Sequence, residues 1–359
     1  MSSAPRPSAF PDDFDVDGPA DPDAGFLGLD PDPAGAEVAL LAVPFDATTS
    51  YRAGARLGPA AILAASRQIE LTCPLFGDTW RRGLWWRGEV EGVVGLQAEV
   101  AEPARRVIEV GGEVAGRREL EADLQAVNDA GEEVNAWVRG AVETQLDLGR
   151  LPVLVGGDHS VPFGAIAAVA ARHPGVGLLH VDAHADLRVA YEGFHWSHAS
   201  ILHNVLDQLD VGPLVQFGLR DLGAAELERI ARSEGRIRAV LDRDWQRAKL
   251  EARDLIALID EQLEHLPNEI YVTVDIDGLD PTLCPHTGTP VPGGFLWHEV
   301  DLLLERLADS GKRVLGLDLV EVAPGPDPRD ATGEPTDSWD AIVGARMLYR
   351  LIGAALANR

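Results

Sequence analysis

The segment Val181-Asp182-Ala183-His184-Ala185-Asp186 follows an apolar run, Val176-Gly177-Leu178-Leu179-His180, that is typical of a buried strand. Alternate residues of a strand point to the same face, so Asp182, His184 and Asp186 are expected to converge where the strand ends. Such polar groups seldom gather in a folded protein unless a cation compensates their charge. The segment therefore predicts a metal site at the end of a strand.

Two further segments repeat this arrangement. Residues 270–274 read as a buried strand that leads into Asp275-Ile276-Asp277-Gly278-Leu279-Asp280-Pro281, and residues 152–155 lead into Gly156-Gly157-Asp158-His159-Ser160. Each segment alone is weak, because Asp and Gly are common in ordinary turns. Together they place hard oxygen ligands and imidazoles after three strands, a combination that suits Mn²⁺ better than structural zinc. Four carboxylates offset the charge of two divalent ions, so the sequence predicts a two-metal site that makes a nucleophile from water.

Strand and helix patterns alternate along most of the chain. This alternation predicts an α/β fold, a single domain with a parallel sheet and helices on both faces. The candidate ligands follow strands, at the carboxyl edge where such sheets place their sites. The expected strands are 36–44, 152–155, 176–180, 215–219, 237–241, 270–275 and 314–320. The expected helices are 59–69, 121–149, 162–172, 198–209, 223–234, 251–266, 298–310 and 338–357.

The chain divides into a short extension and one large domain. Residues 1–34 are rich in Pro, Asp and Ala, which predicts a disordered arm or an extension that packs on a neighbouring subunit. Residues 35–359 show no repeat or linker and are expected to form the catalytic domain. Within them, residues 73–120 have two interpretations, a lid or subunit contact, or a strand-and-loop insertion packed on the core. We favour the insertion.

Composition excludes several classes of function. The 359 residues carry a formal net charge of -27, which repels nucleic acid and anionic membranes. Only Lys249 and Lys312 are lysines. An acid-rich surface with few lysines has two interpretations, a halophilic source or an acidic surface on an ordinary protein. No apolar run approaches the roughly 20 residues that span a bilayer, and no signal peptide is visible. With only Cys73 and Cys284, which cannot form a disulfide framework, we expect a cytoplasmic protein.

The three metal segments resemble the three signatures of the ureohydrolase family, which includes arginase, agmatinase, guanidinobutyrase and formiminoglutamase. Residues 288–294 continue the third signature, residues 317–324 resemble the family's late strand, and residues 51–59 resemble its early loop. The resemblance covers about residues 36–357. It implies an arginase-like three-layer sandwich and an agmatinase-like enzyme, a dimanganese hydrolase that splits a guanidino compound into urea and an amine.

The resemblance also implies roles for the site residues. Asp182 and Asp275 would bridge two Mn²⁺ ions, with Ni²⁺ as a variant. The implied metal ligands are His159, Asp182, His184, Asp186, Asp275 and Asp277.

Two residues are implied for the chemistry itself. Glu321 would pair with the guanidinium, whose fork suits a carboxylate. His198 would be the proton shuttle, since imidazole titrates near neutrality. A helix-start role is the alternative for His198, and His195 is the rival shuttle. His180, on the strand before the metal motif, is interpreted as a core residue.

Departures from the family pattern bear on the substrate. Arg188 stands where arginase has an Asn, and Gly223 stands where arginase has an acidic residue, so agmatine fits better than arginine. Arg188 also leaves room for a guanidino acid, with a surface salt bridge as its alternative role. His286, in the loop after the third signature, is expected to narrow the pocket, and Thr289 is assigned to substrate binding.

Other functions stay open beside this one. The substrate alternatives are guanidinobutyrate, guanidine, arginine and formiminoglutamate. A catalytically idle relative that only binds metal is a second class, and a one-metal amide hydrolase related to zinc deacetylases is a third. The resemblance further implies a homo-oligomer, a trimer or hexamer. The partner that it implies is a small guanidino substrate.

Overall fold

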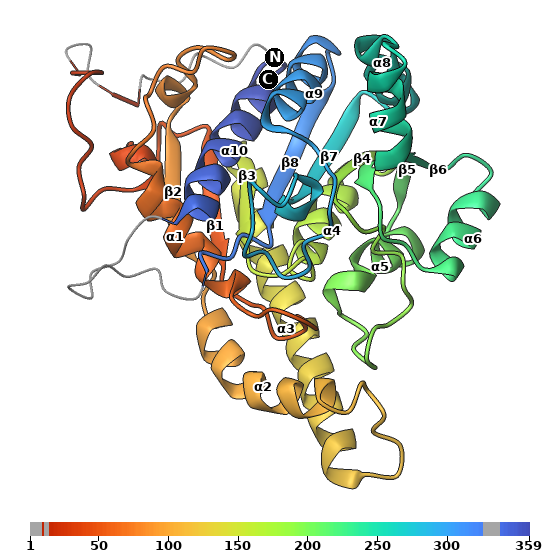
Figure 1. The fold of residues 1–359 in the computed structure, drawn as a ribbon. Coiled ribbons are helices and arrows are strands. Elements are labelled where there is room, and N and C mark those ends of the chain that lie inside the picture. The colour runs from red at the N-terminus through yellow and green to blue at the C-terminus, as the bar shows by residue number, and fades with distance from the viewer. Residues whose placement is uncertain (1–8, 11–13, 326–337) are drawn as a thin grey trace.

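The computed structural model of the chain describes residues 9–10, 14–325 and 338–359. Within them the fold is built on one sheet, in which every neighbouring pair of strands is parallel. The eight strands lie in the order β2-β1-β3-β8-β7-β4-β5-β6 (Figure 1). Their bounds are β1 (Val38–Val43), β2 (Leu84–Glu89), β3 (Leu151–Gly156), β4 (Val176–Val181), β5 (Val211–Leu219), β6 (Ile237–Leu241), β7 (Glu269–Asp275) and β8 (Arg313–Val320).

Helices cover both faces of this sheet. One face carries α1, α7, α8, α9 and α10, and the other carries α2 to α6, each over its own hydrophobic cluster. Their bounds are α1 (Gly58–Ser66), α2 (Val93–Ile108), α3 (Arg118–Asp147), α4 (Phe163–Arg172), α5 (Ile201–Gln208), α6 (Ala224–Arg232), α7 (Asp242–Leu250), α8 (Leu255–His265), α9 (Trp297–Asp309) and α10 (Trp339–Leu356). The central strands are mostly apolar because both faces are buried. The predicted α/β fold is confirmed.

The segment 73–120 differs from the predicted strand-and-loop insertion. The strand exists, since β2 pairs with β1 at the edge of the main sheet. The loop part is wrong, because residues 93–108 form α2, which packs along α3. Pro103 lies inside α2, and an interior proline argues against a helix from sequence alone. Burial of Val100, Ala104 and Val107 against α3 explains why a helix forms nonetheless.

The described part of the N-terminal extension packs on its own chain. Phe26 and Leu27 are buried, and the Leu27 N–H donates to Ser66 Oγ of α1 at 2.9 Å. Phe10 packs edge-on against Trp80, with ring centroids 5.2 Å apart. The predicted disordered arm is therefore not what residues 14–34 form, because their few apolar side chains join the core. Residues 1–8 and 11–13, which the same prediction included, lie outside the described residues.

A second difference concerns residues 242–250. The helix predicted at 251–266 is present as α8, but the structure has a further helix, α7, before it, which the sequence analysis did not predict because the α7 sequence is strongly polar. Trp245 of α7 is nevertheless buried in the core. Across the part of the chain that is described, no helix combines the length and apolar character needed to cross a bilayer.

The register of the central strands places the candidate site. Val274 of β7 pairs with Val181 of β4 on one side and with Leu319 of β8 on the other. The residues that follow these positions, among them Asp182 and Asp275, therefore leave the sheet side by side. β3 lies on the far side of β8, so four adjacent strands deliver their following loops to one edge.

Candidate metal centre

The structure brings the predicted ligands together in two adjoining groups. In each group one ligand atom per residue lies within 4.8 Å of every other. Asp182 belongs to both groups, which is the position expected of a carboxylate between two ions. The first group is His159, His180, Asp182 and Asp186, and the second is Asp182, His184 and Asp277.

Three carboxylates surround one ring nitrogen of His159. His159 Nδ1 lies 3.0 Å from Asp182 Oδ2 and 3.0 Å from Asp186 Oδ2. Asp275 belongs to neither group, but its Oδ2 lies 3.6 Å from the same nitrogen. All four side chains are buried. A site this rich in carboxylate oxygens is suited to a hard divalent cation.

Hydrogen bonds below the site assign the proton of His159. Its Nε2 lies 2.9 Å from Thr273 Oγ1, and the Thr273 hydroxyl donates its single hydrogen to Asp318 Oδ1 at 2.8 Å. Thr273 must therefore accept a hydrogen from His159 Nε2. Nδ1 is then the nitrogen that a cation would bind, in place of the proton that it shares with Asp182 and Asp186. Despite the burial of His159, these two hydrogen bonds raise its pKa well above the usual value. A hydrogen on Nε2 is what a metal ligand at Nδ1 needs. Thr273 and Asp318 escaped the sequence analysis, although Thr273 shares a strand face with Asp275.

Main-chain N–H groups hold one oxygen of each carboxylate of the second group and of the neighbouring Asp275. Asp182 Oδ1 accepts the His184 N–H at 2.6 Å, and Asp277 Oδ1 accepts the Ala183 N–H at 3.0 Å. Asp275 Oδ1 accepts the Asp277 N–H at 2.7 Å. Asp277 Oδ2 points to His184, 3.1 Å from its Nδ1. These bonds orient the carboxylates before any ligand arrives.

Burial and the repulsion between neighbouring carboxylates raise the pKa values of two of the aspartates. Burial, then the neighbouring Asp277 and Asp182, raise the pKa of Asp275 well above its usual value. Burial and Asp182 raise the pKa of Asp186 to about 7. Several buried carboxylates so close together call for positive charge. With two imidazoles beside them, the donor set fits a pair of divalent cations.

Glu321 lies beside this centre with an unsatisfied oxygen. It follows β8 with a φ of 62°, and its Oε1 accepts the His159 N–H at 3.0 Å. Its Oε2 is buried and has no hydrogen-bond partner within the described part of the chain. Burial and the nearby Asp158 raise the pKa of Glu321 well above its usual value. A buried carboxylate oxygen without a donor is costly unless a ligand supplies one.

A cavity of about 140 Å³ opens on the metal centre. His184 and Asp186 line it from the metal side, and His198 lines it from the loop before α5. The His198 N–H donates to Thr48 Oγ1 at 3.1 Å, which ties this loop to residues 44–57. Burial and the neighbouring His184 lower the pKa of His198 to about 4, so its ring is neutral near pH 7. The rival His195 is exposed and does not line this cavity.

The predicted substrate residues divide into two that reach the cavity and one that does not. Arg188 and Thr289 line it, and Thr289 Oγ1 donates to Asp277 Oδ2 at 3.3 Å. His286 does not line it, because its Nδ1 is held 2.9 Å from Asp340 Oδ2 at the start of α10. The expectation that His286 narrows this cavity finds no support in that contact.

Sequence reasoning missed three residues on the outer wall of the cavity. Tyr191 lies under the Arg188 guanidinium, 5.0 Å from ring centre to Cζ, and Glu226 Oε2 lies 3.8 Å from Arg188 Nε. Asp221 lines the same wall and is exposed. The only sequence signal was the Arg220-Asp221 pair after β5. Glu226 lies in the first turn of α6, which it also caps by accepting the Gly223 N–H at 2.8 Å.

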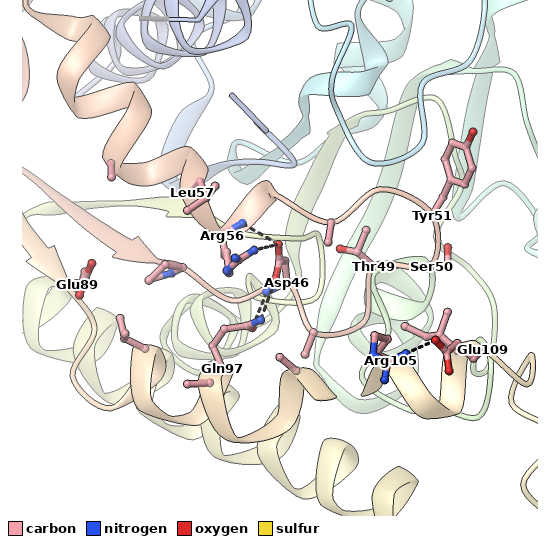
Figure 2. A pocket seen from close by; sticks show the side chains of 18 residues that line it. Asp46, Thr49, Ser50, Tyr51, Arg56, Leu57, Glu89, Gln97, Arg105 and Glu109 are labelled. Carbon is pink, nitrogen blue, oxygen red and sulfur yellow. Dashed lines mark hydrogen bonds and ion pairs between the residues drawn. The ribbon is translucent and has the colours of Figure 1, made fainter. Parts of the chain in front are cut away.

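The loop of residues 44–57 separates this cavity from a second one of about 740 Å³ against α2. Figure 2 shows its anchor, Asp46, which accepts a hydrogen bond from Gln97 Nε2 of α2 at 2.9 Å and lies beside Arg56. Asp46 also accepts the Gly54 N–H at 2.8 Å. Ser50 lines both cavities. The loop is thus held on one side by α2. On the other side its Thr48 hydroxyl donates to Asp158 Oδ2 at 2.8 Å.

Comparisons with known proteins agree with this site. The model of the arginase family matches residues 36–352. An N(1)-aminopropylagmatine ureohydrolase of Thermus thermophilus is 35% identical over 289 residues, 80% of this chain and 83% of that protein. An agmatinase of Bacillus anthracis is 31% identical and covers 82% of this chain and 87% of its own length.

Solved structures share the fold. The agmatine ureohydrolase of Thermoplasma volcanium superimposes with a TM-score of 0.68 at 25% identity, over 96% of both chains. The proclavaminate amidino hydrolase of Streptomyces clavuligerus gives a TM-score of 0.69 at 25% identity, over 93% of this chain and 97% of that one. The resemblance to ureohydrolases, and to agmatinase-like members among them, is confirmed. With most of its length matched by the family, this chain is a hydrolase of the arginase family.

Proposed function

We propose that this protein is a dimanganese hydrolase that cleaves an agmatine-like guanidino compound into urea and an amine. One observation carries the proposal. Two groups of potential metal ligands share Asp182, and Glu321 contacts the main chain of His159 in the first group through its Oε1, while its buried Oε2 has no hydrogen-bond partner among the described residues. Because His159 links the first group to Glu321, a guanidino carbon bound at Glu321 would lie beside the metal ligands.

The six predicted ligands divide naturally between two ions. His159 and Asp186 would hold one Mn²⁺, His184 and Asp277 the other, and Asp182 with Asp275 would lie between them. The pair would supply a nucleophile from water at neutral pH and stabilise negative charge that develops on the substrate. Ni²⁺ satisfies the same oxygen and imidazole ligands and is the alternative metal.

The chain's own residues would bind the substrate and move the proton. Glu321 Oε2 would accept N–H bonds from the guanidinium, which relieves an otherwise unpaired buried oxygen. His198 would pass the proton to the departing amine, because its imidazole lines the cavity beside the metal ligands. Burial and His184 lower its pKa to about 4, so the ring is neutral near pH 7 and would hold that proton only transiently. Thr289 would support Asp277 from the substrate side through its hydroxyl.

The charges of the outer wall favour an amine as the far end of the substrate. Asp221 and Glu226 are acidic, and Arg188 is already engaged by Tyr191 and Glu226. The names of the relatives, an aminopropylagmatine ureohydrolase and an agmatinase, support the same substrate class. A guanidino acid is the second candidate, because Arg188 still lines the cavity and a human guanidino acid hydrolase is 29% identical.

The proposal extends to the setting of the enzyme. Two buried cysteines, neither in a disulfide, support a cytoplasmic location. The family resemblance supports a homo-oligomer, a trimer or a hexamer. The net charge of -27 supports a small cationic substrate rather than nucleic acid or a membrane as partner.

A substrate panel tests the proposal. Urea release by manganese-loaded protein is measured with agmatine, aminopropylagmatine, arginine, 4-guanidinobutyrate and guanidine, and formamide release with formiminoglutamate. We expect a clear preference for a guanidino amine. Preference for 4-guanidinobutyrate would transfer the assignment to the second candidate, and absence of product from every compound with two ions bound would contradict the proposed activity.

A further inference from the structure

His180 and Gln216 lie beneath the metal ligands as a buried polar pair. They are direct partners in the register of β4 and β5, and neither side chain is exposed to solvent. His180 Nε2 lies 2.9 Å from Asp182 Oδ2, and Gln216 Nε2 lies 3.0 Å from His180 Nδ1. Burying two polar side chains within a parallel sheet is costly unless they form hydrogen bonds, so packing alone does not explain their presence.

A main-chain carbonyl determines which way this pair is oriented. Gln216 Nε2 also lies 3.0 Å from the carbonyl oxygen of Ala185, and a carbonyl can only accept. The atom facing Ala185 must therefore be the amide nitrogen, because the reversed amide would set two carbonyl oxygens against each other. The second hydrogen of that nitrogen points to His180 Nδ1, which accepts it. The proton of neutral His180 is then on Nε2, and it is donated to Asp182 Oδ2.

We infer that Gln216 and His180 form a positioning pair that holds the shared carboxylate of Asp182 in place, and that His180 is not a metal ligand. The inference rests on the proposed role of Asp182 between two ions. Each oxygen of Asp182 then has a fixed donor that is not a metal ligand atom, in addition to the contact of Oδ2 with His159 Nδ1 at 3.0 Å. Oδ2 receives His180 Nε2–H on the side of the first group, and Oδ1 receives the His184 N–H on the side of the second.

The two buried histidines of the first group thus have opposite functions. His159 presents Nδ1 to the carboxylates of Asp182 and Asp186, since Thr273 takes its Nε2 hydrogen. His180 has no free nitrogen, since Gln216 occupies Nδ1 and Asp182 takes the hydrogen of Nε2. Proximity alone places both histidines with Asp182 and Asp186. The hydrogen-bond directions separate the ligand from the residue that orients a ligand.

The tautomer of His180 is a direct test in the unaltered protein. Full-length chain labelled with ¹⁵N-histidine is studied by NMR near pH 7.5, both metal-free and loaded with diamagnetic Zn²⁺. The His180 signals are identified as those absent from the His180→Gln variant. We expect the Nε2–H tautomer. A proton on Nδ1, or an Nε2 shift typical of a metal-bound nitrogen, would overturn the inference.

Variants test the consequence for metal binding. His180→Phe removes the donor to Asp182, and we expect Mn²⁺ affinity, measured by chelator competition, to fall about 10- to 100-fold. His180→Gln keeps an N–H donor and should recover most of that affinity. Gln216→Met removes the donor to His180 and should weaken binding less than His180→Phe. The matched control is Gln145→Met, a buried glutamine on α3 that bonds Arg150 and lies outside the site.

The electron paramagnetic resonance spectrum of the manganese-loaded protein adds a signature of the bridge. We expect the coupled dimanganese signal to change in His180→Phe and to return in His180→Gln. Unchanged affinity and signal in His180→Phe would overturn the positioning role. Loss of one whole ion in both His180 variants would make His180 a ligand instead. If His180→Phe does not fold, the inference is tested by the metal affinity of His180→Gln and by the tautomer of His180 in the unaltered protein. A wild-type chain that binds no Mn²⁺ would defeat the proposed function, while the metal-free tautomer would still be read.

Discussion

Glu321 Oε1 accepts the main-chain N–H of His159 at 3.0 Å, across 162 positions of sequence. The contact forms because β8 and β3 are neighbours in the sheet and end at the same edge. It leaves the other oxygen of Glu321 buried and without a hydrogen-bond partner among the residues that the structure describes. One hydrogen bond therefore joins the candidate guanidinium acceptor to a candidate metal ligand.

The first prediction concerns that acceptor. In Glu321→Gln the amide oxygen can still accept the His159 N–H, so the fold and the bound metal should persist. The negative charge for the guanidinium is lost, and we expect kcat/KM for urea release to fall at least about 100-fold. Metal analysis of the same sample serves as the control. Activity within a few-fold of the unaltered enzyme would remove Glu321 from substrate binding.

The second prediction concerns the second group of ligands. Asp277→Ala removes the carboxylate that faces His184 Nδ1 at 3.1 Å. We expect one ion per chain in place of two, measured by metal analysis after gel filtration, and no urea release above background. Asp280→Ala is the matched control, since Asp280 belongs to the same sequence motif but to neither group, and should keep both ions. Two ions in Asp277→Ala would show that this ligand is misassigned.

The third prediction concerns substrate choice at Arg188. Its guanidinium lines the cavity beside Tyr191. In Arg188→Met, loss of the positive charge should lower KM for agmatine by less than about tenfold and raise KM for 4-guanidinobutyrate, as expected for one partly screened charge. The comparison is made by steady-state kinetics with both compounds. Equal changes in KM for the two substrates would show that Arg188 does not sense the charge at the far end of the substrate.

The fourth prediction concerns pH. Burial, then His184, lower the pKa of His198 from 6.5 to about 4 in the folded chain. Below pH 6.5 the unfolded chain therefore binds a proton at His198 that the folded chain does not bind. The free energy of unfolding falls as the pH falls from 6.5 toward 4, and above pH 6.5 His198 causes no such loss.

Replacing His198 by Gln should remove this loss. Metal-free wild type should lose about 2 kcal/mol more than His198→Gln between pH 7 and pH 4.5, measured by urea unfolding. Parallel pH profiles of the two proteins would contradict the lowered pKa.

The fifth prediction concerns a close backbone approach at the site. A Cβ at Gly157 would lie 1.8 Å from the Phe45 carbonyl oxygen, so Gly157→Ala should displace the loop after β3 and cost about 3 kcal/mol. Gly140→Ala is the control, since nothing lies within 4 Å of a Cβ at that exposed position in α3. It should stabilise the chain by about 0.5–1 kcal/mol. Thermal unfolding of both variants checks the pair.

Local patterns predicted the parts of the site that local geometry determines. Asp182, His184 and Asp186 follow one strand, so strand alternation was enough to foresee their convergence. The role of His180 could not be foreseen, because it depends on Gln216, which lies 36 positions away and reaches it only through the register of β4 and β5. The contact of His286 could not be foreseen for the same reason, since its partner Asp340 belongs to a distant helix.

The fold shows the same division between local and distant causes. Buried strands such as β3 and β4 are largely apolar and were visible in sequence. α2 contains a proline and is stabilised by packing on α3, so propensity alone argued against it. Phe26 and Leu27 lie in a segment whose composition suggests disorder, yet they reach the core. Tertiary contacts overrode composition in both places.

The central claim is that two ions held around Asp182 enable urea release. The most direct measurement titrates metal-free protein with Mn²⁺ and follows bound ions per chain and urea release from agmatine in the same samples. The account predicts two bound ions, with urea release rising as the second ion binds. Full activity with one ion, or two ions bound without urea from agmatine or any other guanidino compound of the panel, would contradict it.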